Sequence, residues 1–242
     1  MLYPIQNSIR NKLDISGIWD FQTDPDWVGE ANSWAMGLAE PRPMAVPGSW
    51  NEQYDDLFGY LDLAWYVKTI HVPSGWKGQR VFIRVGSAVY LGTVYLNGVK
   101  VGMHEGGHLP FAFEITDQIK WGEENVLAIS VENVLKPERV PSGNVASSAM
   151  SMFASTPATT YDFYPFSGIH RPVVLYSVPQ TYIEDVTVVT DIEGAGGLVS
   201  VKVKLNDAVA GQGSVELKGD SATYQADLAF RDGLAEVTLT VP

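Results

Sequence analysis

The alternation of apolar and polar positions predicts a β-hairpin in residues 81–103. Val81, Ile83 and Val85 alternate with Phe82 and Arg84, the period of a strand with one face inward, and residues 89–96 are almost wholly apolar. Asn97-Gly98 then separates this run from a second alternating segment that ends at Met103. An Asn-Gly pair between strand-like runs is the strongest short-range signal of a hairpin, because both residues accept positive φ. We expect this hairpin to form the middle of an antiparallel sheet.

The same alternation predicts further short strands in residues 1–180. They lie at residues 13–21, 61–71, 113–115, 125–133 and 173–176, with turns rich in Gly and Pro between them. The prolines of residues 41–50 forbid a helix and a central strand there, and residues 32–38 are expected to form one helical turn. About eight strands separated in this way predict a jelly-roll β-sandwich over residues 1–180.

The pattern changes after Pro179-Gln180, which we interpret as a linker. Residues 181–242 contain about five alternating segments separated by Gly and Asp turns. An immunoglobulin-like sandwich needs about seven strands and roughly 100 residues. We therefore expect a partial, truncated immunoglobulin-like domain at 181–242. The predicted fold class is all-β: a jelly-roll β-sandwich followed by a partial immunoglobulin-like β-sandwich.

Composition narrows the classes of function. The 242 residues have a net charge of -12, which argues against nucleic acid and anionic membranes as partners. We also expect no signal peptide and no membrane span, because no apolar run has the required length. The chain has no cysteine, which excludes disulfides and thiolate metal sites and favours a cytoplasmic location. The four histidines lack metal-ligand spacing, so we expect no metal and no cofactor.

Several short motifs occur in order along the chain: Gly59-Tyr60, Trp65-Tyr66, Val72-Pro73, Asn97-Gly98, His104-Glu105-Gly106-Gly107, Pro110-Phe111, Asn125-Val126-Leu127 and Asn133. As an ordered set they resemble the N-terminal sugar-binding domain of family 2 glycoside hydrolases. Tyr-Asp-Phe-Tyr at 161–164 and Gly-Ile-His-Arg at 168–171 look most like the β-glucuronidase branch of that family. The resemblance covers essentially the whole chain.

The resemblance implies a jelly-roll domain, an immunoglobulin-like domain and then a TIM barrel that carries the active site. A barrel needs ~250 residues, more than follow Thr181. In this family the two catalytic glutamates lie on barrel strands, one of them in an Asn-Glu-Pro motif. This sequence has no such motif, and Asn51-Glu52-Gln53 is only a near match in a loop. We therefore expect no catalytic residue here, and no hydrolysis by this chain alone.

Two positions depart from the family pattern. Gly106-Gly107-His108 stands where members commonly have Gly-Gly-Tyr, and residues 165–168 read Pro-Phe-Ser-Gly where members often have Asn-Tyr-Ala-Gly. In the family the second stretch lies beside the segment that approaches the active site. We expect this departure to shift the substrate preference.

Asp162 is the candidate substrate-binding residue that the resemblance implies. In the β-glucuronidase branch the matching aspartate reaches into the mouth of the barrel and hydrogen-bonds the bound sugar. A carboxylate suits this role because it accepts two hydroxyl hydrogens in charge-assisted bonds. The alternative is an aspartate that accepts hydrogen bonds from backbone amides within its own loop.

The surroundings of Asp162 allow two interpretations. Residues 136–160 form a long loop of the kind that is usually functional or mobile. His170 and Arg171 either line a pocket or, as we favour, hold the loop through hydrogen bonds and a salt bridge to a carboxylate. The nearby aromatic residues stack on a ligand or, as we favour, pack against the first sheet or a barrel. They are Tyr161, Phe163, Tyr164 and Phe166.

Three functions remain open from the sequence. The first is the non-catalytic N-terminal portion of a retaining, β-glucuronidase-like hydrolase of terminal β-D-glycosidic bonds. Its partners are the carbohydrate, the C-terminal barrel of the same protein and, through a dimerisation surface, a second copy in a homo-oligomer. The alternative is a stand-alone carbohydrate-binding module with exposed aromatic side chains. The third is a structural assembly module without a ligand. The unfinished last domain favours the first.

Overall fold

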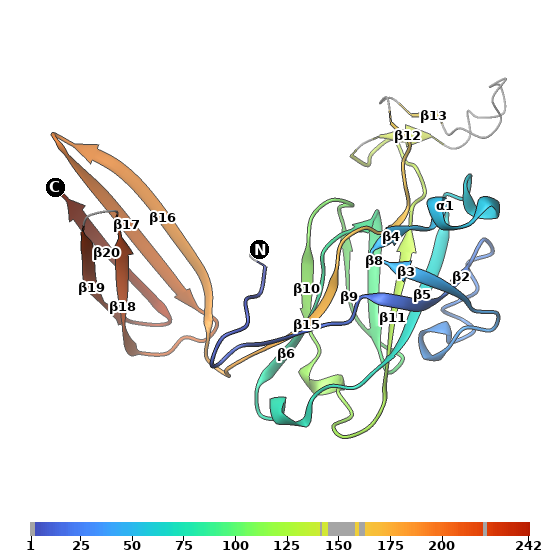
Figure 1. Ribbon diagram of the computed structural model, residues 1–242, viewed down its shortest axis with the longest axis horizontal. Coiled ribbons are helices and arrows are strands. Elements are labelled where there is room, and N and C mark those ends of the chain that lie inside the picture. The colour runs from blue at the N-terminus through green and yellow to red at the C-terminus, as the bar shows by residue number, and fades with distance from the viewer. Residues whose placement is uncertain (1–2, 141, 145–157, 160–162, 220–221) are drawn as a thin grey trace. The chain divides into compact units, whose positions relative to one another are not determined.

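The computed structural model describes residues 3–140, 142–144, 158–159, 163–219 and 222–242. It separates into two compact units, unit 1 (Met1–Ser177) and unit 2 (Val178–Pro242) (Figure 1). Both units are built from β-strands, which confirms an all-β fold. The helices in the described residues are single turns: α1 (Trp50–Gln53) and the 3-10 turns Trp34–Met36, Asp55–Leu57, Ser74–Trp76 and Thr116–Gln118. The turn at Trp34–Met36 confirms the helical turn expected within 32–38.

Two large sheets form unit 1. The first has the order β1 (Asn11–Asp14), β15 (Val173–Val178), β6 (Arg80–Val85) and β10 (Phe111–Glu114). The second has the order β3 (Arg42–Val46), β2 (Gly17–Thr23), β5 (Leu63–Ile70), β11 (Asn125–Glu132), β8 (Leu91–Leu96) and β9 (Val99–Glu105). Pro43 lies in β3, which is an edge strand, as expected for a proline that cannot donate to a neighbouring strand.

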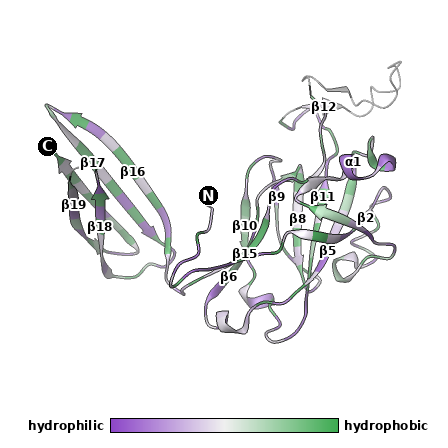
Figure 2. Ribbon diagram, in the orientation of Figure 1, coloured by the Kyte–Doolittle hydropathy of each residue, from purple (hydrophilic) through white to green (hydrophobic). Residues whose placement is uncertain are grey.

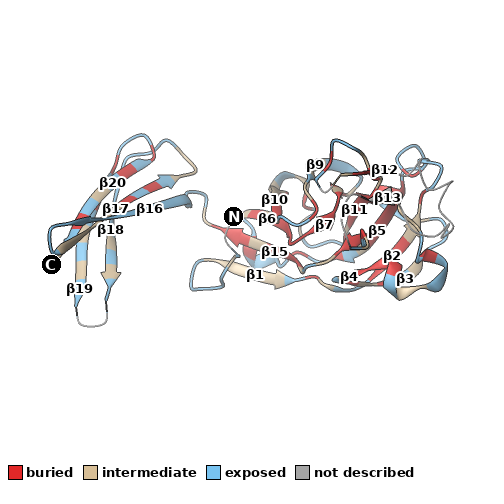
Figure 3. Cartoon of the chain, turned by 90° about the horizontal axis from the view of Figure 1, so that it is seen from above, coloured by how far each residue is buried: buried red, intermediate tan, exposed pale blue. Residues whose placement is uncertain are grey.

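The core of unit 1 lies between these two sheets. Alternate residues of β6 and β15 contribute from one sheet, and alternate residues of β2, β5 and β11 contribute from the other. Trp19, Phe21, Trp50 and Tyr66 are at most 1% exposed and form its aromatic centre. The strands β5 and β11 are buried along most of their length (Figure 3), as is β8, and β11 is mostly hydrophobic (Figure 2). Unit 1 is thus a β-sandwich.

The predicted hairpin is present, but it is not in the middle of a sheet. Asn97 and Gly98 have φ values of 53° and 80°, which are the positive values that the turn between β8 and β9 requires. However, β9 is the edge of the six-stranded sheet, and β6 belongs to the other sheet. The centre is occupied by β5 and β11, which pair with each other over their whole length. Strand order is a tertiary property, which local alternation does not encode.

Residues 13–21 form two strands where one was expected. β1 ends at Asp14 and pairs with β15, whereas β2 begins at Gly17 and pairs with β3 and β5. Gly17 has a φ of 105°, which favours glycine, and the side chain of Asp14 accepts a hydrogen bond from the backbone of Ser16. This turn carries the chain from one sheet to the other.

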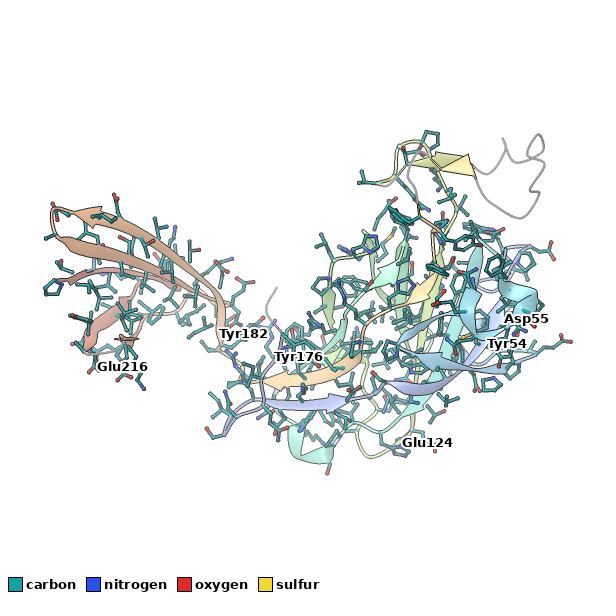
Figure 4. All side chains as sticks on the ribbon, turned by 45° about the horizontal axis from the view of Figure 1, so that its top comes forward. Tyr54, Asp55, Glu124, Tyr176, Tyr182 and Glu216 are labelled. Carbon is teal, nitrogen blue, oxygen red and sulfur yellow. The ribbon has the colours of Figure 1, made fainter. Side chains whose placement is uncertain are left out.

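The outer faces of both sheets are also partly covered. Trp34 and Ala35 of the 3-10 turn pack on Trp65, Tyr95 and Ala128 on the outer side of the six-stranded sheet. On the four-stranded sheet, the ring of Tyr176 (Figure 4) stacks on that of Phe82, with ring centroids 5.1 Å apart. The strands β5, β8 and β11 are therefore buried on both faces, which explains why residues 89–96 are almost wholly apolar.

Unit 2 contains five strands within its described residues. They are β16 (Ile183–Glu193), β17 (Gly196–Leu205), β18 (Gly211–Lys218), β19 (Thr223–Phe230) and β20 (Leu234–Val241). β16, β17 and β20 form one sheet, and β18 and β19 form the other. A small core draws on β17, β19 and β20, and includes Val201, Val203, Leu228 and Phe230. Every residue of β16 is exposed, including its valines. The five alternating segments of the sequence are confirmed as these five strands.

Candidate functional site

Asp162, the predicted substrate-binding residue, lies outside the described residues, as does Tyr161. Phe163, the next residue, is again among the described residues. The candidate site is therefore built from residues 163–171, which follow Asp162 directly, and from the parts of unit 1 that they contact. The role of Asp162 in binding substrate stays a prediction.

Two buried asparagines fix the segment 163–171. Asn133 is fully buried, and its side-chain amide donates to the carbonyl of Pro165 at 2.8 Å and to the hydroxyl of Ser167 at 2.6 Å. Asn51 is 2% exposed, and its Oδ1 accepts a hydrogen bond from the backbone N–H of Ser167 at 2.8 Å. The carbonyl of Ser167 in turn accepts from the backbone of Trp50 at 3.2 Å. A segment distant in sequence is thereby held against the body of unit 1.

Glycine is required just after this anchor. Gly168 and Ile169 form β14, which lies between β4 (Gly48–Ser49) and β7 (Ala88–Val89) in a small sheet. Gly168 has a φ of 120°, and a Cβ there would lie 2.8 Å from the carbonyl oxygen of Gly48. Any larger residue would both strain the backbone and collide with β4. The position of β14 therefore depends on this glycine.

Two hollows share Phe166 and His170 as lining residues, and together we call them the His170 cleft. One, of about 280 Å³, is lined by Pro47, Gly48, Ser49, Glu52, Phe166 and His170. The other, of about 170 Å³, is lined by Val89, Tyr90, His108, Phe163, Tyr164, Pro165, Phe166 and His170. A third hollow, of about 480 Å³, is lined by residues of β2, the following turn, Arg42 and Asp56, and does not include the segment 163–171.

The aromatic residues of the segment divide between packing and exposure. Tyr164 stacks on Phe58 with ring centroids 5.3 Å apart, and its hydroxyl donates to the Phe58 carbonyl. Its ring also lies 5.0 Å from that of Phe166. Phe163 is 56% exposed and Phe58 is 50% exposed. Tyr164 thus packs within unit 1, whereas more than half of the surface of Phe163 is exposed beside the cleft.

His170 is held as a neutral ring. Burial is the main cause that lowers its pKa, and the nearby charges of Arg171 and His108 act in the same direction. The backbone of Ser167 and the charge of Glu52 act in the opposite direction and raise this pKa, but burial outweighs them. The Nε2 atom is buried and has no hydrogen-bond partner among the described residues. The ring therefore lines the cleft while its Nε2 atom is closed off from solvent.

Arg171 does not form the predicted salt bridge within the described part of the chain. Its guanidinium donates to the backbone carbonyl of His108 at 2.7 Å. That bond ties the end of the segment to the loop between β9 and β10, which is not the loop 136–160, so the prediction that Arg171 holds the loop 136–160 stays a prediction. The prediction of a carboxylate partner for Arg171 is not confirmed within the described residues, where the partner of its guanidinium is a backbone carbonyl.

A buried ion cluster lies at the start of the loop 136–160. The side chain of Arg139 is 4% exposed and donates to Glu132 and to Glu105, at 2.8 Å in each case. It also donates to the carbonyl of Val134 at 2.6 Å, and Lys136 lies 3.2 Å from Glu132. The cluster joins this loop to β9 and β11. Sequence reasoning missed it, and it also missed Asn51 and Asn133 as anchors. The only available signal was a polar side chain within or beside an apolar run.

Two absences within the described residues bear on the chemistry. Within the described ranges, no three His, Asp or Glu side chains gather closely enough to hold a metal ion. In the same ranges no helix has the length and apolar character needed to cross a bilayer. The polar groups of the residues that line the His170 cleft are histidine rings, the carboxylate of Glu52 and hydroxyl groups. All of these can form hydrogen bonds with a ligand.

The chain matches known proteins along most of its length. Residues 11–179 match the family model described as "Glycosyl hydrolases family 2, sugar binding domain". A β-glucuronidase of Paenibacillus borealis is 35% identical over 95% of this chain, and that of Mus musculus is 33% identical over 98%. These matches span 41% and 39% of the two relatives, so the chain covers about two fifths of their length.

Solved structures give the same result. A Ruminococcus gnavus β-glucuronidase in complex with D-glucuronic acid superimposes with a TM-score of 0.84 at 28% identity, over 98% of this chain and 41% of that one. The apo structure of that enzyme also gives 0.84. Together with the family model and the sequence relatives, this likeness means that the chain belongs to glycoside hydrolase family 2, of which it contains the sugar-binding domain.

Proposed function

We propose that this chain is the non-catalytic N-terminal portion of a retaining β-glucuronidase. The observation that carries the proposal is the match of nearly the whole chain to β-glucuronidases, of which it spans about two fifths. In this proposal a TIM barrel of the same protein supplies the two carboxylates, which retaining glycosidases hold about 5 Å apart. The carbohydrate partner is a β-glucuronide, and a second copy of the chain is a further partner in a homo-oligomer.

The role of unit 1 is to hold Asp162 where it can meet the sugar. Asn51 and Asn133 fix the residues that directly follow it, and Gly168 sets the position of β14. An anchored neighbouring segment reduces the conformational entropy that a carboxylate loses when it accepts hydroxyl hydrogens. The absence of cysteine supports a cytoplasmic location for this enzyme.

The test compares the chain alone with the chain joined to its downstream barrel. We expect the joined protein to hydrolyse 4-nitrophenyl β-D-glucuronide and the 242-residue chain to hydrolyse nothing. In the joined protein, Asp162→Ala should lower kcat/KM for the glucuronide at least about tenfold, as for one charge-assisted bond. Asp117→Ala is the matched control, because Asp117 is exposed in the turn Thr116–Gln118. Equal kinetics for the two variants would remove the role of Asp162.

The exposed rings of Phe58 and Phe163 favour the second candidate, a stand-alone carbohydrate-binding module. Glycan titration of the 242-residue chain separates the two. Binding tighter than about millimolar that Phe163→Ala abolishes would favour the module. Absence of such binding, with glucuronide hydrolysis in the joined protein, supports the enzyme.

A further inference from the structure

The third hollow, of about 480 Å³, shares no lining residue with the His170 cleft. We call it the Arg42 hollow. Its volume lies within the ~300–1,000 Å³ that small-molecule sites occupy. The charged and amide side chains that line it are Gln22, Asp24, Asp26, Glu40, Arg42 and Asp56.

Asp24 makes one wall of the Arg42 hollow rigid. It is 1% exposed, and its carboxylate accepts hydrogen bonds from the backbone N–H groups of Val28 at 2.8 Å and Gly29 at 2.9 Å. Nε1 of Trp65 donates to the same carboxylate at 2.9 Å. Three donors on one buried carboxylate fix the turn 24–29. Asp26, within this turn, therefore lines the hollow from a backbone that is already ordered.

Arg42 is also held in place. Its Nη1 atom donates to the two carboxylate oxygens of Asp56, at 2.9 and 3.1 Å. Its guanidinium carbon lies 4.4 Å from the ring centroid of Tyr54, which Figure 4 labels. Nε and Nη2 of Arg42 donate to no acceptor among the described residues, so their hydrogens are available to a ligand.

The amide of Gln22 supplies a second donor. Its Oε1 atom accepts a hydrogen bond from the backbone N–H of Glu40 at 2.8 Å, which sets the orientation of the amide group. The NH₂ group on the same side chain keeps its two hydrogens for other acceptors. The Arg42 hollow therefore contains oriented donors as well as carboxylate acceptors.

A ligand from solvent can reach these groups. The side chain of Asp56 is 66% exposed and that of Arg42 is 30% exposed. Asp26 and Glu40 are exposed residues. Ligand contact with the Arg42 hollow thus needs no opening of the fold.

Charge and hydrogen-bonding capacity together select the class of ligand. Four carboxylates and one guanidinium line the hollow, so an anion is repelled. A simple cation would offer no acceptor to Arg42 or to the amide of Gln22. Neighbouring hydroxyl groups both donate and accept hydrogen bonds, so they match carboxylates, guanidinium and amide at once.

We propose that the Arg42 hollow binds an uncharged sugar ring. Hydroxyl groups of the sugar donate to Asp26 and Glu40, and accept from Arg42. A uronic acid is disfavoured there, because its carboxylate would meet the carboxylates of the hollow. The inference goes beyond the proposed function and does not depend on it, because every residue involved belongs to unit 1.

The first test measures binding to the 242-residue chain by NMR, through the side-chain signals of Gln22 and Arg42. The neutral probes are methyl β-D-glucopyranoside and methyl β-D-galactopyranoside, and the charged probes are D-glucuronate and D-glucosamine. We expect saturable shifts with a neutral probe, with a Kd of about 1 mM, as is usual for a ligand of this size. Glucuronate should bind about tenfold more weakly.

Three outcomes of this titration would overturn the inference. They are binding of glucuronate as tight as that of the neutral probes, binding of glucosamine alone, and no saturable shift up to about 50 mM of either neutral probe. Hydrolysis of glucuronides plays no part in the measurement, so none of these outcomes bears on the proposed function.

The second test reverses the preference for charge. The double variant Asp26→Asn with Glu40→Gln removes two exposed carboxylates and keeps the size of both side chains. We expect it to weaken binding of the neutral probe about tenfold, because neutral acceptors replace charged ones. The same variant should strengthen binding of glucuronate, because the repulsion falls.

Opposite changes for the two ligands separate a binding role from damage to the fold, which would weaken both. Asp117→Asn is the matched control, because Asp117 is exposed in the turn Thr116–Gln118 and does not line the hollow. Changes in the same direction for both ligands, or affinities equal to those of Asp117→Asn, would overturn the inference.

Discussion

Oδ1 of Asn51 accepts a hydrogen bond from the backbone N–H of Ser167 at 2.8 Å, across 116 residues of sequence. The amide of Asn51 donates at the same time to the carbonyls of Leu57, Phe58 and Tyr60. One buried side chain thus joins the turn after α1 to the segment that follows Asp162. The local arrangement of the candidate site depends on this connection.

Replacing Asn51 should loosen that connection. Asn51→Ala leaves the Ser167 amide and the carbonyls without partners, so we expect the free energy of unfolding to fall by about 1–3 kcal/mol. Urea denaturation measures the loss, and hydrogen exchange at Ser167 should accelerate. Asn32→Ala is the control, because Asn32 is exposed and should change stability by less than about 0.5 kcal/mol. Equal stability of the two variants would contradict the assignment.

Gly168 should tolerate no side chain. In Gly168→Ala the Cβ would lie 2.8 Å from the Gly48 carbonyl oxygen and 2.9 Å from the Tyr66 hydroxyl, at a φ of 120°. We expect a loss of at least about 1–3 kcal/mol in thermal or urea unfolding. Gly75→Ala is the matched control, because no atom lies within 4 Å of its Cβ position. The idea fails if Gly168→Ala is as stable as Gly75→Ala.

The lowered pKa of His170 predicts a pH dependence of stability. The unfolded chain binds a proton near the ordinary histidine pKa of about 6.5, whereas the folded chain binds it only at lower pH. Stability is therefore full above pH 6.5 and falls as the pH drops toward the folded pKa, by at most about 1.4 kcal/mol per pH unit.

The measurement is urea unfolding between pH 7.5 and pH 5. His170→Gln should lose less stability than the unaltered chain over this range, because glutamine does not titrate. His71→Gln is the control, since the side chain of His71 is 70% exposed. An unaltered chain that gains stability relative to His170→Gln on acidification would rule out the buried neutral ring.

Removing Arg139 should be more damaging than removing a surface ion. Arg139→Met leaves Glu132, whose side chain is 7% exposed, with Lys136 as its one charged partner among the described residues. Breaking a buried ion pair typically lowers the free energy of unfolding by about 3–5 kcal/mol. Because Lys136 still faces Glu132, we expect a loss near the lower end of this range. Urea unfolding measures the change.

Two variants control for that result. Asp56→Asn disrupts the exposed pair with Arg42 and should cost less than about 1 kcal/mol. Glu132→Leu combined with Arg139→Met removes the uncompensated charge and should recover part of the loss. A single Arg139→Met as mild as Asp56→Asn would show that the cluster is not important for stability.

Much of the architecture follows from the sequence because it is local. Alternation identifies the strands, since successive side chains of a strand point to opposite faces. The hairpin turn follows from Asn97-Gly98, where both residues have positive φ. The confinement of Pro43 to an edge strand follows from its missing N–H. The ordered motifs, from Gly59-Tyr60 to Asn133, also indicated the family that the comparisons then established.

Only the tertiary structure decided how these pieces meet. Strand order placed β9 at an edge, the turn at Gly17 divided one expected strand between two sheets, and Asn51 was brought to Ser167. The pairing of Arg139 with Glu105 and the unused nitrogen of His170 likewise depend on neighbours distant in the chain. The physical reason is that burial and hydrogen-bond satisfaction are set by all the segments that pack together, whereas the period of a strand is set by its own residues.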